Sequence, residues 1–287
     1  MKPKDSIILN SISRERLEEF FKGAYWYHFI DTGLGIVTPG AFDYRPVLDK
    51  FHFPESLKGK TVLDVGASNG YFSFLFEKKG VEKVLAVDTD KYDGTLPYTF
   101  APKFEENFKR KYARDAEYYE KFRDIYTCLN LNGSNNLLVL ADIFQSKVQW
   151  KNHSIYNLEA LNEQFDLVFC GSLIEHLKNP VEGVEQLCKA TKELCIISLS
   201  NCIYWWPLNI LAKFACAFSI RLPFDKLVLY QGNVSGGSFF HFHPLAFKEL
   251  LIASGFSKVE IVSMFKIRNY KRDYIRYSPH AIFHCYK

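Results

Sequence analysis

Short apolar runs alternate with amphipathic segments from residue 61 to the end of the chain. The apolar runs predict strands at 61–65, 83–88, 147–152, 165–170, 194–199, 258–265 and 280–286. The helical spacing of apolar residues predicts the helices around them, near 71–79, 136–145, 181–192 and 244–254. Such alternation is typical of an α/β fold, in which a parallel sheet carries helices on both faces.

Three segments stand outside this alternation. Residues 1–60 contain a predicted helix near 13–22 and an irregular stretch, so we assign them to an N-terminal extension that acts as a lid. Residues 61–287 form the main domain, with insertions expected near 91–135 and 201–240. In the first insertion, aromatic residues at helical spacing predict an amphipathic helix. This helix packs on the core, or else forms a lid or a dimer contact. Its aromatic residues at helical spacing are Phe104, Phe108, Tyr112, Tyr119 and Tyr126.

The second insertion contains a mostly apolar stretch at 202–220. Polar residues and a proline interrupt it, and it is barely long enough to span a bilayer. From residue 208 on, the apolar residues fall on one helical face. We expect a helix that packs over the core or lines a substrate pocket, with peripheral contact to a membrane surface as the alternative. We expect no transmembrane span.

The composition is that of an ordinary globular protein. The chain has 287 residues, of which 48% are hydrophobic, and its net charge of +4 is too small to indicate a nucleic-acid partner. Seven cysteines without a Cys-x-x-Cys pair fit reduced thiols better than disulfides or zinc. The first 20 residues carry charges throughout and do not resemble a signal peptide. We therefore expect a cytoplasmic protein.

The segment from Leu63 to Tyr71 carries the most specific chemistry. A predicted buried strand ends at Val65, a turn with two glycines follows, and Tyr71 begins a helix. A strand, a glycine turn and a helix N-terminus form a site for a nucleotide-like ligand, because glycine lets the ligand approach the backbone. The carboxylate of Asp64 suits a positively charged ligand better than a pyrophosphate. The turn also lacks the Gly-x-Gly-x-x-Gly pattern of dinucleotide sites.

A second acidic residue supports an adenosyl ligand. The next predicted strand ends at Asp88, about 20 positions after the glycine turn, where a carboxylate can accept hydrogen bonds from both ribose hydroxyls. The sulfonium and ammonium groups of S-adenosylmethionine are positive, so Asp64 can offset their charge. The two carboxylates and the turn together favour this cofactor.

These residues resemble the first two motifs of the class I S-adenosylmethionine-dependent methyltransferases. Residues 165–177 are similar to the family's fourth strand and the loop that passes beneath the methionine half of the cofactor. The resemblance implies a Rossmann-like, doubly wound sheet of seven strands, with an antiparallel last hairpin and a helical N-terminal extension. It also implies a cofactor site made of Asp64, Val65, Gly66, Ala67, Ser68, Asn69, Gly70, Asp88, Thr89, Ser154, Ile155, Gly171, Ser172 and Leu173.

A narrower resemblance covers the extension. The extension is similar to the segment that precedes the methyltransferase core in the family that includes the tRNA wobble-uridine carboxymethyl-transferring enzyme. The matching positions are Trp26, Tyr27, His28, Gly33, Gly35, Thr38, Pro39, Gly40, Asp43 and Arg45. The resemblance implies that Tyr27, His28 and Arg45 close the site and contact the substrate. The longer N-terminal domain of the tRNA enzyme has no counterpart here, so the tRNA substrate and the carboxylated cofactor are kept as alternatives.

Four residues are candidates for catalysis, because a general base assists transfer to a hydroxyl. Glu175 and His176 follow the fourth predicted strand, and either could be the base or shape the pocket floor. His241 and His243 alternate in an extended segment and can face one side. Substrate contact, acid–base work and a structural role before the next helix stay open for this pair. No Cys, Asp or Glu nearby completes a metal site, so we expect no bound metal.

We therefore predict a methyltransferase that acts on an oxygen or nitrogen of a small polar or sugar-like molecule. An acceptor with a lipid part would suit the apolar stretch. One alternative is an enzyme that modifies tRNA, which needs a basic surface such as residues 266–276 or 109–114, although acidic residues are interleaved in both regions. A second alternative is a non-catalytic module that binds the adenosyl group. The sequence does not predict the oligomeric state.

Overall fold

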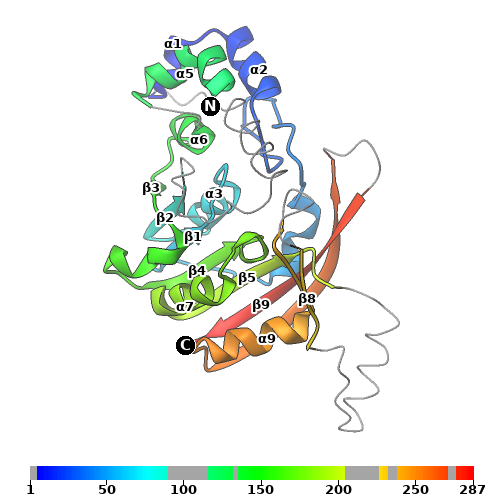
Figure 1. Cartoon of the computed structure of the whole chain (residues 1–287). Coiled ribbons are helices and arrows are strands. Elements are labelled where there is room, and N and C mark those ends of the chain that lie inside the picture. Colours follow the sequence, from blue (N-terminus) through cyan, green and yellow to red (C-terminus); the bar gives the residue numbers. More distant parts are fainter. Residues whose placement is uncertain (1–4, 90–115, 132–134, 204–225, 232–237, 271–275) are drawn as a thin grey trace.

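The computed structural model describes residues 5–89, 116–131, 135–203, 226–231, 238–270 and 276–287 (Figure 1). The apolar helix predicted from residue 208 lies outside these ranges, as does the amphipathic pattern from Phe104 to Tyr112. Among the described residues, no helix combines the length and the apolar character needed to cross a membrane.

A seven-stranded sheet forms the centre of the fold, in the order β3-β2-β1-β4-β5-β9-β8. The strands β1 to β5 are parallel, and β9 runs antiparallel to both of its neighbours. This confirms the predicted doubly wound sheet with an antiparallel last hairpin. The strands are β1 (Thr61–Val65), β2 (Lys83–Asp88), β3 (Gln149–Asn152), β4 (Phe165–Gly171), β5 (Thr191–Ser200), β8 (Lys258–Asn269) and β9 (Arg276–Tyr286).

The last hairpin extends further than its apolar residues predict. The strand β8 continues four residues beyond 265, and β9 begins four residues before 280. In this distal part of β8, Lys266 and Arg268 are exposed on either side of the buried Ile267. Residues that alternate between exposed and buried do not form a continuous apolar run. The apolar pattern of the sequence therefore predicted both strands too short.

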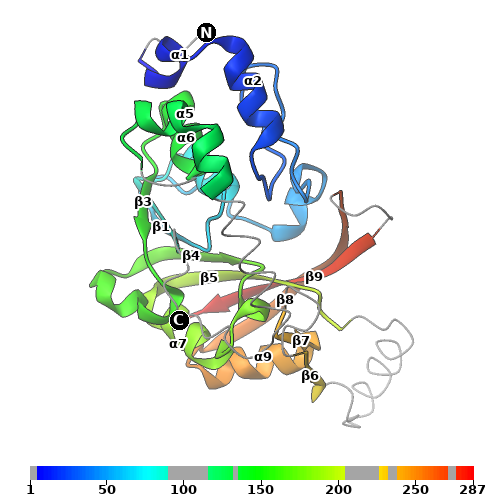
Figure 2. The same cartoon turned by 45° about the horizontal axis from the view of Figure 1, so that its top comes forward.

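Helices cover both faces of the sheet, as the alternation of elements predicts (Figures 1 and 2). One face carries α3 (Tyr71–Lys78) and α6 (Asn136–Phe144). The other face carries α7 (Pro180–Ala190) and α9 (Pro244–Ala253), whose last turn is followed by Gly255 with a φ of +108°. The central strands are therefore buried on two sides, which explains their continuous apolar sequence. Two further strands, β6 (Val228–Tyr230) and β7 (Phe240–Phe242), form a small separate sheet.

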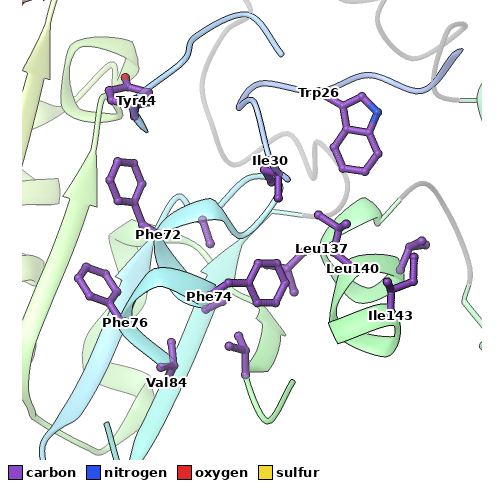
Figure 3. Close-up of a cluster of buried hydrophobic side chains, with 14 of the residues drawn as sticks. Trp26, Ile30, Tyr44, Phe72, Phe74, Phe76, Val84, Leu137, Leu140 and Ile143 are labelled. Carbon is purple, nitrogen blue, oxygen red and sulfur yellow. The ribbon is translucent and has the colours of Figure 1, made fainter. Parts of the chain in front are cut away.

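The N-terminal extension shares a hydrophobic core with the main domain. Its helices α1 (Ile7–Ser11) and α2 (Arg14–Gly23) lie beside α5 (Arg123–Cys128) and α6 (Figure 1). Trp26 is fully buried and donates a hydrogen bond from Nε1 to the carbonyl oxygen of Phe21 at 2.9 Å. Figure 3 shows Trp26 and Ile30 of the extension beside Leu137 of α6. The extension is thus packed on the sheet's helical layer.

One carboxylate fixes the start of the extension. Asp142 of α6 accepts hydrogen bonds from the hydroxyl of Ser6 at 2.6 Å and from the amides of Ile7 and Ile8 at 3.1 and 3.0 Å. These amides belong to the first turn of α1, where no carbonyl oxygen within the helix can accept hydrogen bonds from them.

Replacing Asp142 with alanine is expected to lower the free energy of unfolding by about 1–2 kcal/mol, because α1 loses its capping acceptor. Urea denaturation measures this loss. Asp142→Asn keeps one acceptor oxygen and should lose less. Equal losses in the two variants would contradict the capping role.

The direction of the strand order changes at β1. The chain runs outward from β1 to β2 and β3, then returns to form β4 on the other side of β1. Loops that follow β1 and β4 therefore leave the sheet in opposite directions. Ligands of doubly wound folds bind at the carboxyl ends of the strands at such a point.

Candidate active site

The glycine turn after β1 is held against the end of β2. The amides of Gly66 and Ala67 donate to the carbonyl oxygen of Val87 at 2.9 and 3.2 Å. The amide of Ser68 donates to Oδ2 of Asp88 at 2.7 Å. The turn needs a glycine, since Gly66 has a φ of +76° and a Cβ atom there would lie 3.0 Å from the side chain of Leu173. The turn and Asp88 therefore form one preorganised unit.

This unit fits an adenosyl cofactor. Asp88 is half-buried, and the amides of Ser68 and Thr89 donate to its two oxygens at 2.7 Å each, so the carboxylate has a fixed orientation. The side chain of Leu173, in the loop after β4, lies over Gly66. The loops that follow β1 and β4 thus meet at the carboxyl ends of the strands.

Asp64 has a different environment from the one its sequence position suggests. It is only 2% exposed, and its Oδ2 accepts a hydrogen bond from the hydroxyl of Ser73 in α3 at 2.5 Å. Burial raises the pKa of its carboxyl group to about 7. Asp64 therefore ties β1 to α3. Its contribution to the charge around a cofactor stays a prediction.

Replacing Asp64 with asparagine is expected to change the pH dependence of stability. A carboxyl whose pKa is raised on folding stabilises the protein most below its ordinary pKa of 3.8, and that stability is lost as the pH rises through about 7. Between these pH values the variant should gain about 1 kcal/mol per pH unit relative to the wild type. Urea denaturation at two pH values in this window measures the difference. The exposed Asp49→Asn variant is the control, and a slope identical to that of the wild type would contradict the assignment.

The other predicted cofactor residues line the same edge of the sheet. Ser172 has a φ of +53°, and its amide donates to the carbonyl oxygen of Ser198 at 2.8 Å, which fixes the loop after β4. Ser154 follows β3, and its hydroxyl accepts from the amide of Tyr156 at the start of a short 3-10 helix. Ile155 is buried. Adenine contact by Ser154 and Ile155 stays a prediction.

Glu175 is a fully buried carboxyl group at the end of this loop. Its Oε1 accepts hydrogen bonds from the amide of Ser200 at 3.0 Å and from the hydroxyl of the same residue. Its Oε2 has no hydrogen-bond partner among the described residues. Burial raises the pKa of Glu175 to about 7. The neighbouring His176 is only half-buried, so the structure distinguishes the two candidate bases.

Four polar side chains from distant parts of the sequence meet close to Glu175, and we call Tyr27, Tyr44, Ser172 and His280 the hydroxyl cluster. Nε2 of His280 lies 3.2 Å from Oη of Tyr44 and 3.4 Å from Oγ of Ser172. The rings of Tyr27 and Tyr44 both pack against Phe42, with centroids 5.1 and 6.3 Å from it. The charge of Glu175 contributes to raising the pKa of both phenols, after burial as the main cause. The cluster and Glu175 therefore share one polar site.

Tyr44 and His280 were not among the site residues predicted from the sequence. Tyr44 stands between the two matched positions Asp43 and Arg45, so the narrower resemblance surrounded it without singling it out. His280 is one polar residue in an otherwise apolar strand and gave no functional signal. Its position becomes informative only because β9 pairs with β5, which places His280 opposite Ser200.

Two of the three predicted substrate residues lie at the glycine turn. The amide of Tyr27 donates to Oδ1 of Asn69 at 2.6 Å, so this predicted cofactor residue holds the extension against the turn. The buried ring of His28 stacks on Tyr71 with centroids 5.4 Å apart, and its Nδ1 has no partner among the described residues. Arg45 is 43% exposed and forms an ion pair with Asp43 at 2.6 Å.

The two downstream histidines have separate environments. His241 is in β7, with its Nδ1 3.3 Å from Nε2 of Gln231. His243 lies beyond the strand and caps α9, where its Nδ1 accepts from the amide of Leu245 at 3.3 Å. This contact gives His243 a structural role at the start of the next helix, one of the three roles considered for it from the sequence. In the described part of the chain, no group of three or more His, Cys, Asp or Glu residues could hold a metal ion.

Comparisons with known proteins identify the family and the fold. A family model described as a methyltransferase domain matches residues 43–261. The solved N-terminal domain of EvdMO1, in the presence of S-adenosylhomocysteine (SAH) and D-fucose, is 12% identical with a TM-score of 0.55, covering 96% of this chain and 98% of that one. The same domain with SAH bound is 11% identical with a TM-score of 0.56 and the same coverage. At this identity the likeness shows the fold alone.

This chain matches only part of a larger EvdMO1 structure. Against that structure the identity is 12% and the TM-score 0.50, covering 95% of this chain and 46% of the other. A search among proteins of curated function found no match. The comparisons give no support to the narrower resemblance to the tRNA wobble-uridine enzyme.

Proposed function

Because this chain belongs to the methyltransferase domain family, we propose that it methylates a hydroxyl or amine of a small polar, sugar-like molecule. It is an S-adenosylmethionine-dependent enzyme with the class I fold. The nature of the acceptor is our proposal. The observation that carries it is the buried Oε2 of Glu175, which faces no protein partner among the described residues and stands beside the hydroxyl cluster.

The residues around this oxygen suit a hydroxyl acceptor. A buried carboxyl group with a pKa near 7 can be ionised at neutral pH and can take a proton from a bound hydroxyl. The two bonds from Ser200 hold its other oxygen, so Oε2 keeps a fixed direction. The phenols of Tyr27 and Tyr44 provide further polar contacts. An apolar acceptor would leave these groups without partners, which costs free energy.

The division of work among the residues follows from their positions. S-adenosylmethionine supplies an electrophilic methyl group when it is bound. Asp88 and the turn at Gly66 would hold its ribose and methionine parts, and Asp64 supports the turn from inside. Glu175 receives the proton of the acceptor hydroxyl at Oε2. Tyr27, held by Asn69, covers the site from the extension, and we propose that residues 1–60 act as its lid.

The proposal extends to the surroundings of the enzyme. Buried free cysteines, such as Cys170 and Cys195, suit a reducing compartment, and we place the enzyme in the cytoplasm. The likeness in fold to EvdMO1, whose domain was crystallised in the presence of D-fucose, supports the choice of sugars as the first acceptors to test.

Methyl transfer to a panel of acceptors tests this function. The purified protein is incubated with S-adenosylmethionine and either neutral sugars, beginning with D-fucose, or bulk tRNA, and mass spectrometry detects methylated products. We expect a methylated sugar and unmodified tRNA. Methylation of tRNA alone would favour the RNA alternative, whose exposed basic residues in the described structure include Lys266, Arg268 and Arg276. Binding of SAH without any product would favour the non-catalytic module.

A further inference from the structure

Apolar and basic side chains are exposed together on two neighbouring segments of the described structure. These segments are β6 and the distal part of the last hairpin, residues 264–270 and 276–277, and we call them the hairpin surface. We propose that the hairpin surface docks on an anionic phospholipid bilayer. This inference goes beyond the proposed function and does not depend on the nature of the acceptor.

Backbone hydrogen bonds join β6 to the hairpin through residues 202–203. The first of these two amides donates to the carbonyl oxygen of Pro279 in β9 at 3.4 Å, and the second donates to that of Phe242 in β7 at 2.9 Å. Phe242 is paired with Val228 of β6, and Pro279 is paired with Lys266 of β8. The two segments therefore lie side by side and form one surface.

The apolar side chains of the described structure that are exposed gather on this surface. Of the eleven large hydrophobic side chains that the described residues expose, six belong to β6 and the distal hairpin. All three residues of β6 are exposed, up to 67% for Tyr230, although successive residues of a strand point to opposite faces. A cluster of exposed apolar side chains is typical of a binding surface, whereas scattered ones are not.

The distal hairpin buries one face and exposes the other. Ile267 belongs to the hydrophobic core that β8 shares with the extension. Its neighbours Lys266 and Arg268 point to the opposite face and are exposed. Tyr277 is paired with Arg268, so it shares this face, and it is 55% exposed. Basic and aromatic side chains therefore lie together on the exposed face.

The charge of the hairpin surface is positive. Residues 266–276 contain five basic residues and one acidic residue, so this segment alone carries a net charge of +4, equal to that of the whole chain. Among the described residues of the surface, three are basic and none is acidic. Such a surface attracts anionic lipid headgroups. It repels the same surface on a second copy of the chain, which disfavours self-association through this face.

The apolar part of the surface favours a bilayer over RNA. RNA is bound through its phosphates and its stacked bases, and neither gains from contact with Val228 or Leu229. A bilayer accepts apolar side chains at its interface, and tyrosines are favoured at the level of the headgroups. The mostly apolar stretch at 202–220 also begins at this surface, because its first two residues join β7 to β9.

Flotation with vesicles tests the surface without cofactor or acceptor. The purified protein is mixed with vesicles of phosphatidylcholine alone, or of phosphatidylcholine and phosphatidylglycerol in equal parts. We expect about hundredfold tighter binding to the anionic vesicles, from about fivefold for each of three basic residues, and weaker binding as the salt concentration rises. Arg268→Gln and Arg276→Gln should each weaken this binding about fivefold. Leu229→Ser, which removes apolar area, should have an effect of about the same size.

Matched substitutions at other exposed positions serve as controls. Arg123→Gln on α5 and Ile7→Ser on α1 should bind the anionic vesicles like the wild type. Circular dichroism verifies that every variant is folded. Hydrogen exchange in the presence of anionic vesicles locates the contact, and we expect added protection of residues 226–231 and 264–270.

The contrary outcomes are independent of methyl transfer, which the acceptor panel tests separately. Equal binding to both kinds of vesicle, or binding to neither, would overturn the proposal. Binding of bulk tRNA that Arg268→Gln weakens, without binding to vesicles, would assign the surface to RNA. Self-association that Leu229→Ser abolishes would assign it to a second copy of the chain. Vesicle binding that is unchanged in all three variants would place the membrane contact elsewhere.

Discussion

Replacing Asp88 with alanine is expected to weaken the binding of SAH about a hundredfold. The carboxylate is held by the amides of Ser68 and Thr89 in a position to accept from two ribose hydroxyls. Hydrogen bonds to a charged group contribute about 1.5–3 kcal/mol each, and a loss of about 3 kcal/mol corresponds to this factor. The variant also removes the acceptor that fixes the glycine turn. Calorimetric titration with SAH measures the effect.

Two further variants serve as controls for Asp88→Ala. Asp88→Asn keeps the shape and one acceptor oxygen, so a loss of about tenfold is expected. Asp49→Ala removes an equal charge from an exposed position on the extension and should bind SAH like the wild type. An Asp88→Ala variant that is folded and binds SAH within threefold of the wild type would show that the cofactor is held elsewhere.

Replacing Glu175 with glutamine is expected to lower the rate constant of methyl transfer by a factor of about 10²–10⁴, the usual contribution of a general base. Glutamine has nearly the same shape and keeps an acceptor oxygen for Ser200, so the fold should be retained. The rate of the wild type should increase as the pH rises through about 7, because the base must be ionised. The variant should lack this increase.

The measurement separates chemistry from binding. Initial rates are recorded with the acceptor identified in the panel, across the pH range, together with the affinity for SAH. Glu185→Gln makes the same substitution at an exposed position of α7 and serves as the control. Retention of the wild-type rate and pH profile in Glu175→Gln would move the role of base to another residue, with His176 the next candidate.

The order and type of the elements could be predicted from the sequence because each central strand is buried on both sides. Continuous apolar runs such as residues 84–87 leave little ambiguity, and glycine and proline mark the boundaries of the helices between them. The last four residues of β8 and the first four of β9 were not predicted, since their stability depends on pairing with each other. Pairing between strands is a tertiary effect that local periodicity does not contain.

The candidate site was likewise predictable from the sequence in one part and not in another. The glycine turn and Asp88 form a local motif whose members are about 20 positions apart, so their relation is visible in the sequence. The bond between Tyr44 and His280 depends on the extension and the last strand meeting across the sheet. The burial that raises the pKa of Asp64 also comes from the assembled fold. Residue types could be proposed in advance, but not their partners.

The bond from Tyr44 to His280 joins positions that are 236 residues apart, and this distance has a consequence during synthesis. A ribosome that adds about 5–20 residues per second completes β1 to β5 several seconds before it completes β9. During that time the glycine turn and Asp88 are already made, while β5 is an open edge that can pair with other chains. The nascent protein therefore makes the glycine turn and Asp88 first, and its last strand both covers the edge of β5 and brings His280 to Tyr44.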